Sequence, residues 1–145
     1  MDWENIPENI DKWFGFVYCI ERINACQGEK KYYWGCKQFK KNVKLPPLKG
    51  KKRKRRKESE SDWKNYYGSS EELKKDVILH GKENFKRTIL KLCTCKWQLK
   101  YEELVTQLEN KVLFRDDTYN GIIHVRINSV PKALKENYAL DNFRL

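Results

Sequence analysis

The sequence predicts an α/β fold of the α+β kind, and three segments carry that prediction. Two aromatic and β-branched runs, residues 14–23 (FGFVYCIERI) and 31–36 (KYYWGC), flank the polar stretch INACQGEK, a pattern typical of an antiparallel hairpin. Residues 84–93 form a third short apolar run, which we interpret as another strand. Two amphipathic segments predict the helices that accompany these strands.

The first helix is expected in the segment SSEELKKDVILHG. Ser69 stands three residues before Glu72, which is the spacing of a capping box. Leu73 and Val77 are four residues apart, and Gly81 marks the end of the helix.

The second helix is expected from about Lys96 to Leu113. Its apolar residues recur at helical spacing and predict the buried stripe Trp97, Tyr101, Leu104, Val105, Leu108 and Val112. Glu103 lies nearly opposite the centre of that stripe and Glu102 lies on its flank. Geometry alone therefore predicts two solvated glutamates.

The net charge of +11 comes from one segment. Residues 37–57 contain 12 Lys and Arg and no acidic residue, so the other 124 residues sum to 11 − 12 = −1. Pro46, Pro47 and Gly50 interrupt regular structure, and the segment is expected to be a mobile basic loop. Such a loop favours salt-sensitive binding to nucleic acid, although a nuclear localisation signal or a solvated tail has the same composition.

Length and cysteine content indicate the class of protein. A chain of 145 residues suits a single domain with a core of its own. Five cysteines without a secretory leader predict reduced thiols in an intracellular protein, and the apolar runs are too short to span a membrane. Cys93 and Cys95 form the one close pair, which argues against structural zinc.

Several motifs then occur in a defined order: GFVY, YWG, ESDWKNYYGSS, L-x-x-x-E-x-x-x-Q at residues 99–107, and YNG at 119–121. In this order the chain resembles the GIY-YIG nucleases, and more narrowly the free-standing homing endonucleases of T4-like phages. The resemblance covers residues 14–123. It implies a small three-stranded antiparallel sheet flanked by helices, with DNA phosphodiester hydrolysis dependent on one divalent metal, Mg²⁺ or Mn²⁺.

The resemblance also implies site residues. Tyr18 and Tyr33 match the two signature tyrosines, Glu103 matches the metal-binding glutamate, and Asn120 matches the late asparagine. Glu102 is the competing metal ligand and ranks second.

Two family positions have less clear counterparts. The family arginine has three candidates, Arg53, Arg55 and Arg56, since positions 38–52 hold only lysines as cations. Tyr66 is the best match to the histidine or tyrosine of the first helix. The expected DNA-binding residues are Lys37, Lys51, Lys52, Arg53, Lys54, Arg55, Arg56, Lys57 and Trp63.

The chemistry of phosphodiester cleavage fits these residue types. Negative charge that develops on the phosphoryl and leaving oxygens is stabilised by a metal ion and a basic side chain. A phenol beside cations is expected to ionise more readily and to take a proton from water. The hairpin is expected to hold Tyr18 and Tyr33 as cross-strand neighbours about 5 Å apart. Taken singly, Tyr18 or Tyr33 would more often have a packing role than a catalytic one. Trp63 and Tyr66 could stack on bases or cover the sheet.

The sequence therefore predicts one GIY-YIG-like domain over residues 1–145, with a core at 14–123, a basic insertion at 37–61 and an extension at 124–145. The extension is expected to contain a short strand-like run and, after Pro131, a modest helix. A phage-encoded endonuclease in the cytoplasm of the infected bacterium is the first hypothesis. A monomer would nick DNA and a homodimer could cut both strands. A binding module without activity and a protein that acts on another nuclease or host factor are the alternatives.

Overall fold

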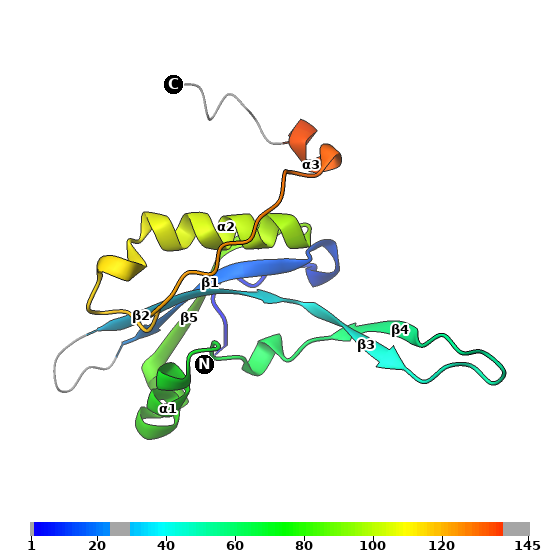
Figure 1. The fold of residues 1–145 in the computed structure, drawn as a ribbon. Helices are drawn as coiled ribbons and strands as arrows, with labels where there is room; N and C mark the ends of the chain where they lie inside the picture. The colour runs from blue at the N-terminus through cyan, green and yellow to red at the C-terminus, as the bar shows by residue number, and fades with distance from the viewer. Residues whose placement is uncertain (1, 24–29, 138–145) are drawn as a thin grey trace.

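The computed structural model describes residues 2–23 and 30–137. A three-stranded antiparallel sheet in the order β2 (Lys31–Gln38), β1 (Gly15–Arg22), β5 (Phe85–Cys93) forms the centre of the molecule (Figure 1). This confirms the predicted α+β fold, with its hairpin and third strand. The turn expected between β1 and β2, with Cys26, lies outside the described residues. No described helix combines the length and the apolar character that crossing a membrane requires.

β1 is the central strand, and both of its faces are buried over most of its length. Phe16, Tyr18 and Ile20 point into a large aromatic core on one side, while Val17 packs with Cys93 on the other. The pairing of β1 with β5 shifts register between Val17 and Tyr18. Such irregularities bend a strand locally and re-aim the side chain beside them, here that of Tyr18.

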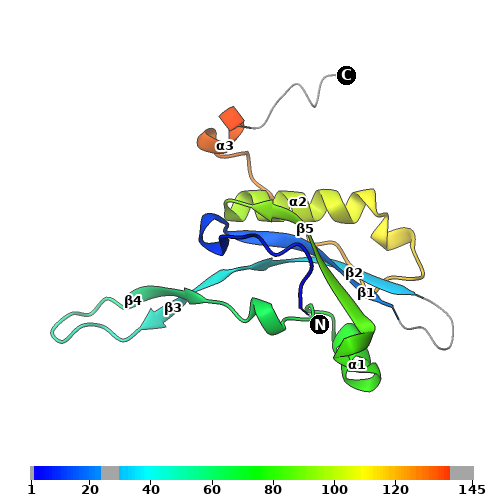
Figure 2. The same ribbon diagram turned by 180° about the vertical axis from the view of Figure 1, so that it is seen from behind.

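The two faces of the sheet carry different helices (Figures 1 and 2). α1 (Glu71–His80) contributes Leu73 and Val77 to the aromatic core, as predicted. Its N-cap is Ser70, whose side chain accepts a hydrogen bond from the Leu73 N–H, so the predicted capping box at Ser69 is wrong by one residue. Ser69 is bonded to Tyr33 instead, and this competing partner decides the start of the helix.

α2 (Lys96–Glu109) lies across the opposite face of the sheet, and its predicted buried stripe is wrong except for Val112, which is buried in the turn after the helix. The buried residues are Leu99, Thr106 and Gln107, whereas Leu108 is 58% exposed. Gly15 permits the close approach, because a Cβ there would lie 2.9 Å from the Leu99 Cδ2 atom. Gln107 forms a hydrogen bond to the Trp34 carbonyl at the edge of the sheet, so a polar residue of the helix faces the sheet. The spacing of apolar residues gives no indication of such a bond.

The basic segment forms a β-ribbon, not the expected loop. β3 (Lys40–Leu45) pairs in antiparallel fashion with β4 (Arg55–Glu60), and the pair projects away from the body (Figure 1). Pro46, Pro47 and Gly50 lie in the connection between the strands, where they break no ladder. Opposite charges face each other where Lys40 pairs with Glu60, which offsets part of the repulsion.

The base of the ribbon is anchored in the core through Phe39, which is fully buried. The Phe39 N–H donates to the Phe14 carbonyl at 3.0 Å, and the Phe39 carbonyl accepts from the Ser61 N–H at 2.9 Å. The chain of β2 therefore continues into β3 while its partner changes from β1 to β4.

The segment after residue 121 runs past α2 before it reaches α3 (Lys132–Asn137) (Figure 1). The helix predicted after Pro131 is confirmed, but the strand-like run around residues 124–128 is not a strand. Its attachment is through side chains, and the Trp97 Nε1–H donates to the Asn128 carbonyl at 2.7 Å.

Candidate active site at the edge of the sheet

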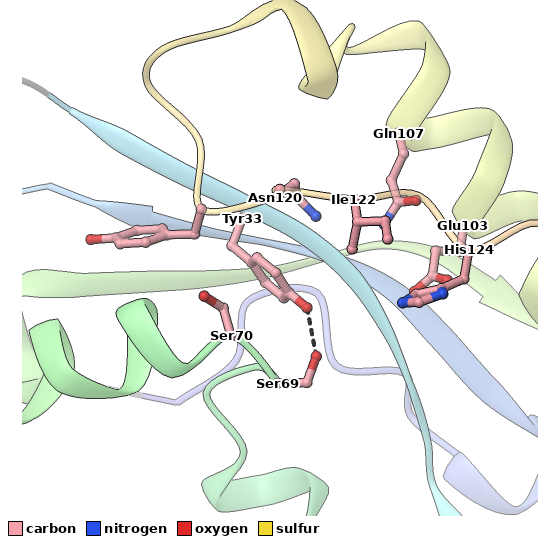
Figure 3. A pocket seen from close by; sticks show the side chains of 10 residues that line it. Tyr33, Ser69, Ser70, Glu103, Gln107, Asn120, Ile122 and His124 are labelled. Carbon is pink, nitrogen blue, oxygen red and sulfur yellow. Dashed lines mark hydrogen bonds between the residues drawn. The ribbon is translucent and has the colours of Figure 1, made fainter.

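A cavity of about 410 Å³ opens at the outer edge of β2 (Figure 3). Tyr33 of β2 and Ser69 enter it from one side, and Glu103 of α2 enters it from the other. Asn120 and His124 come from the chain that follows α2. Segments far apart in the sequence therefore meet at this edge, among them three of the predicted site residues.

Three phenols cluster beside the cavity. The ring centroids of Tyr18 and Tyr33 are 6.1 Å apart, and those of Tyr18 and Tyr66 are also 6.1 Å apart. Tyr18 pairs with Gly35 in the sheet, not with Tyr33, so the expected direct cross-strand pair is replaced by a diagonal one. The predicted proximity of the two tyrosines holds all the same.

Gly35 explains how the Tyr18 hydroxyl reaches this cluster. A Cβ atom at position 35 would lie 2.7 Å from the Tyr18 Oη atom and 3.0 Å from the Tyr33 ring. The absence of a side chain therefore lets the phenol of Tyr18 lie over the backbone of β2. This gives the YWG motif a steric reason.

The Gly68-Ser69-Ser70 sequence positions the other side of the cluster. Gly68 has a φ of +86°, a conformation that favours glycine, and it packs against the ring of Tyr33. The Ser69 hydroxyl is hydrogen-bonded to the Tyr33 hydroxyl at 2.7 Å. The residue that precedes the N-cap of α1 is thereby bonded to the second signature tyrosine.

Burial makes the inner phenols harder to ionise, Tyr18 more than Tyr66. It raises the pKa of Tyr18 well above its usual value, and the neighbouring Tyr33 and Tyr66 raise it further. Burial also raises the pKa of Tyr66, while hydrogen bonds with Tyr18 and Ser69 offset part of that effect. The shift runs opposite to the predicted ionisation, because removal from water penalises the phenolate. Tyr18 is 1% exposed, so its side chain contacts its neighbours and has almost no surface open to solvent.

Lys37 is the cation that the structure brings to the phenols. Its Nζ atom lies 4.1 Å from the centre of the Tyr66 ring and 2.7 Å from Asp62 Oδ1. The hydrogen bond from Lys37 lowers the pKa of Asp62. Lys37 was predicted to contact DNA, and this position suits contact with a phosphate next to the cluster.

The three candidate arginines lie elsewhere. Arg55 and Arg56 belong to β4, and Arg53 belongs to the connection at the end of the ribbon. None of the three is among the cavity-lining residues that the structure describes. Their catalytic role stays a prediction, and Lys37 has the better position for it.

The two glutamates of α2 have different surroundings. Glu102 forms a salt bridge with Lys91 at 3.0 Å on the sheet. Glu103 lines the cavity and forms no salt bridge within the described part of the chain. Glu103 is hydrogen-bonded to Cys36, and the pKa of Cys36 is raised by burial and then further by Glu103. This contrast favours Glu103 as the ligand of a cation.

The cavity suits a cation that needs few protein ligands. Among the described residues no group of three or more His, Cys, Asp or Glu side chains could hold a metal ion. Mg²⁺ commonly uses one or two carboxylates and completes its shell with waters and substrate phosphates. One carboxylate at an open, polar cavity fits that requirement, whereas a structural zinc site does not.

Asn120 serves as a clamp in this structure. Its side chain accepts a hydrogen bond from the Trp34 N–H at 2.9 Å and donates one to the Trp34 carbonyl at 2.8 Å. Gln107 donates to the same carbonyl at 3.0 Å. These side chains fasten α2 and residues 118–121 to the free edge of β2, so the L-x-x-x-E-x-x-x-Q and YNG motifs act together.

Two further outcomes concern residues outside the cavity. Trp63, which was predicted to contact DNA, is 2% exposed and donates its Nε1–H to Glu60, so it belongs to the core. Trp3 precedes the expected core yet packs within it and donates to the Trp63 carbonyl at 2.7 Å. No periodic signal at the start of the sequence indicated this role. The four described cysteines, Cys19, Cys36, Cys93 and Cys95, are free thiols.

This fold and this site define a small α+β domain with two signature tyrosines on adjacent antiparallel strands and one glutamate that lines the cavity at the edge of the sheet. A family model described as "Putative endonuclease segE, GIY-YIG domain" matches residues 3–123. The chain therefore belongs to the GIY-YIG endonuclease family. Searches of curated proteins and of solved structures gave no match.

Proposed function

We propose that this protein is a divalent-metal-dependent DNA endonuclease. The observation that carries the proposal is the cavity at the edge of β2, where Tyr33 and Glu103 meet beside Tyr18, Tyr66 and Lys37. Family membership supports a nuclease in general, and the basic ribbon supports DNA as the substrate. By the sequence resemblance, we further propose a phage origin and action in the cytoplasm of the infected bacterium.

The residues of the site suit distinct parts of a phosphodiester hydrolysis. Glu103 would hold Mg²⁺ or Mn²⁺, which when bound would stabilise negative charge on the phosphoryl oxygens and the leaving 3′ oxygen. Tyr33 reaches the cavity and is assigned to contact with the scissile phosphate. Lys37 supplies a positive charge beside it.

Tyr66 is the phenol that we assign to proton transfer from water. Hydrogen bonds from Tyr18 and Ser69 lower its pKa against the effect of burial, and Lys37 lies over its ring. Tyr18 is accordingly a positioning residue that donates to Tyr66. Asn120 and Gln107 keep the edge of β2 in place.

One site in each chain has a consequence for the product. A monomer would nick duplex DNA, and double-strand cleavage would require a second copy. The binding module without activity remains the second candidate for a specific reason: Arg53, Arg55 and Arg56 lie on the ribbon and not at the cavity.

Cleavage of supercoiled plasmid by the purified protein tests the proposal. We expect nicking with Mg²⁺ or Mn²⁺ and none after metal removal with EDTA. Glu103→Gln should lower the rate by about a hundredfold or more, since it removes the charged ligand. Glu102→Gln is the matched control and should cut at nearly the normal rate, because Glu102 is bound to Lys91.

Binding of a duplex in EDTA separates the two candidates. Both glutamate variants should bind as well as the unmodified protein or slightly better, because a carboxylate that faces phosphate repels it in the absence of a cation. Binding without any metal-dependent nicking would establish the module. Loss of nicking in Glu102→Gln and not in Glu103→Gln would move the metal site by one residue.

A further inference from the structure

The two faces of the ribbon differ in charge. The register pairs Lys41 with Ser59, Val43 with Lys57 and Leu45 with Arg55, and these six residues share one face. This face, called here the acid-free face, carries three cations and no carboxylate. The opposite face carries Lys40, Asn42, Lys44, Arg56, Glu58 and Glu60. The sequence shows one basic segment. The pairing of β3 with β4 divides its side chains between two faces that differ in charge.

The end of the opposite face nearest the body, with Lys40, Glu58 and Glu60, also contacts the rest of the protein. Lys40 forms a salt bridge with Asp11 at 3.1 Å, and Glu60 accepts from the Trp63 Nε1–H and pairs with Lys64. Lys40 and Glu58 line a second cavity together with residues 11–14. Carboxylates and internal partners make this face a poor match for a polyanion. On the acid-free face, Lys41, Arg55 and Lys57 are all exposed.

The acid-free face continues the face of β2 that carries the site. Along β2, alternation places Tyr33, Gly35 and Lys37 toward the aromatic core side. Phe39 keeps this alternation, because its ring contacts Phe16 and Trp63 in the same core. Since β2 runs into β3 through Phe39, Lys41 and the acid-free face follow on the side of Tyr33 and Lys37.

The dimensions match a groove of duplex DNA. A two-stranded ribbon fits the major groove, which is about 12 Å wide. From Lys37 to Leu45 an extended chain spans about 26 Å at roughly 3.3 Å per residue, less than the 34 Å of one helical turn. The ribbon tip, residues 46–54, adds five cations without an acidic residue: Lys49, Lys51, Lys52, Arg53 and Lys54.

We propose that the acid-free face of the ribbon enters the major groove of the duplex that is cut, within one turn of the phosphate held at Tyr33 and Lys37. The proposal rests on the proposed endonuclease function. Lys41, Arg55 and Lys57 contact the duplex on this face, and Glu58 and Glu60 point away from it. Through these contacts the enzyme could prefer particular base sequences within one turn of the bond that it cuts.

Two double variants with equal loss of charge test the assignment. Lys41→Gln with Lys57→Gln removes two cations from the acid-free face, and Lys40→Gln with Lys44→Gln removes two from the opposite face. Fluorescence anisotropy of the full chain with a labelled duplex in EDTA measures both. We expect the first variant to lower the slope of log K against log salt by about 1.8 and the affinity at least tenfold, and the second to change affinity less than threefold.

A groove competitor provides the second measurement. Distamycin, which occupies the minor groove of A·T-rich DNA, should leave the affinity unchanged, whereas methylation of guanine N7 in the major groove should weaken binding. Equal weakening by the two double variants, or competition by distamycin, would overturn the proposal. If the unmodified protein fails to bind the duplex and to nick plasmid with Mg²⁺, the proposed function itself is wrong. Matching melting temperatures of the two variants ensure that a difference reports on DNA contact.

Discussion

The central sheet and the ribbon are built from one continuous chain, yet they hold their residues in opposite ways. In β1 most side chains are buried, and Tyr18 and Gly35 fit against each other within contact distance. In β4 almost every side chain is exposed, and the backbone ladder to β3 is the main restraint. The sheet therefore determines chemistry through precise packing, and the ribbon determines affinity through charge. Changes in the two regions should affect different measurements.

Removal of one hydroxyl from the sheet should have the largest effect. Tyr18→Phe keeps the ring but removes the hydrogen bond to Tyr66, and we expect turnover to fall by about a hundredfold, the usual order for a proton-transfer contribution. Because that bond lowers the pKa of Tyr66, the rising limb of the pH–rate profile should move to higher pH.

The affinity of Tyr18→Phe for DNA in EDTA should not change. Tyr32→Phe is the matched control, because Tyr32 stacks on Trp34 outside the phenol cluster. Normal turnover with an unshifted pH profile in Tyr18→Phe would leave Tyr18 with a packing role alone.

Neutralisation of the ribbon should change binding and leave the body intact. Replacing the cations of residues 51–57 by Gln should weaken duplex binding roughly tenfold or more and flatten its salt dependence, since each lost phosphate contact lowers the slope by about 0.9. The melting temperature should stay within a few degrees, because these side chains are exposed. An unchanged slope would exclude the ribbon as the phosphate-binding element.

A pair of glycine substitutions compares the two regions directly. Gly35→Ala places a methyl group 2.7 Å from the Tyr18 hydroxyl, and overpacking of this kind costs about 1–3 kcal/mol. Gly50→Ala, in the ribbon tip, meets no atom within 4 Å and carries only the strain of its φ of +83°, about 1 kcal/mol confined to the loop.

Thermal unfolding measured for both variants should therefore show a fall of several degrees for Gly35→Ala and little change for Gly50→Ala. Nicking should be lost only in the first. A larger fall in melting temperature for Gly50→Ala than for Gly35→Ala would mean that the ribbon contributes more to stability than the packing of the sheet.

Alkaline pH should gradually lower the free energy of unfolding of the domain. Burial raises the pKa of Cys19 and of Cys93 to about 12, from 9.0 in water. Both groups are neutral in the folded and unfolded chain below pH 9, and above it the unfolded chain loses its protons first. The free energy of unfolding should therefore fall as pH rises from 9 to 12. Chemical denaturation across that range should show a shallower decline in Cys93→Ala, and an identical decline would contradict the assignment.

The sequence predicted correctly those strands and helices that depend on patterns among neighbouring residues. The apolar and aromatic runs indicated β1, β2 and β5, and the spacing of Leu73, Val77 and Gly81 indicated α1. Prediction failed where a distant partner decides the outcome. The N-cap moved to Ser70 because Tyr33 binds Ser69, and the buried face of α2 changed because Gln107 bonds to the edge of β2.

The site shows the same division. Motif order alone indicated Tyr18, Tyr33, Glu103 and Asn120, and the structure places the last three at one cavity with Tyr18 beside it. The position of Lys37 over Tyr66 and the clamp that Asn120 forms on Trp34 were not predictable, because both depend on distances across strands. The choice between Glu102 and Glu103 likewise depends on the salt bridge of Glu102 with Lys91. Lys91 lies in β5, so helical periodicity gives no information about it.

The sequence by itself determined the class of this protein: the order of its motifs, the concentration of positive charge in one segment and the hydrophobic runs that form the sheet. These are properties of neighbouring residues, and they need no knowledge of the fold. Only the tertiary structure decided that the basic segment is a ribbon with two unlike faces and that its acid-free face continues the face of Tyr33. The physical reason is that strand register and the exchange of β1 for β4 at Phe39 depend on hydrogen bonds between distant residues.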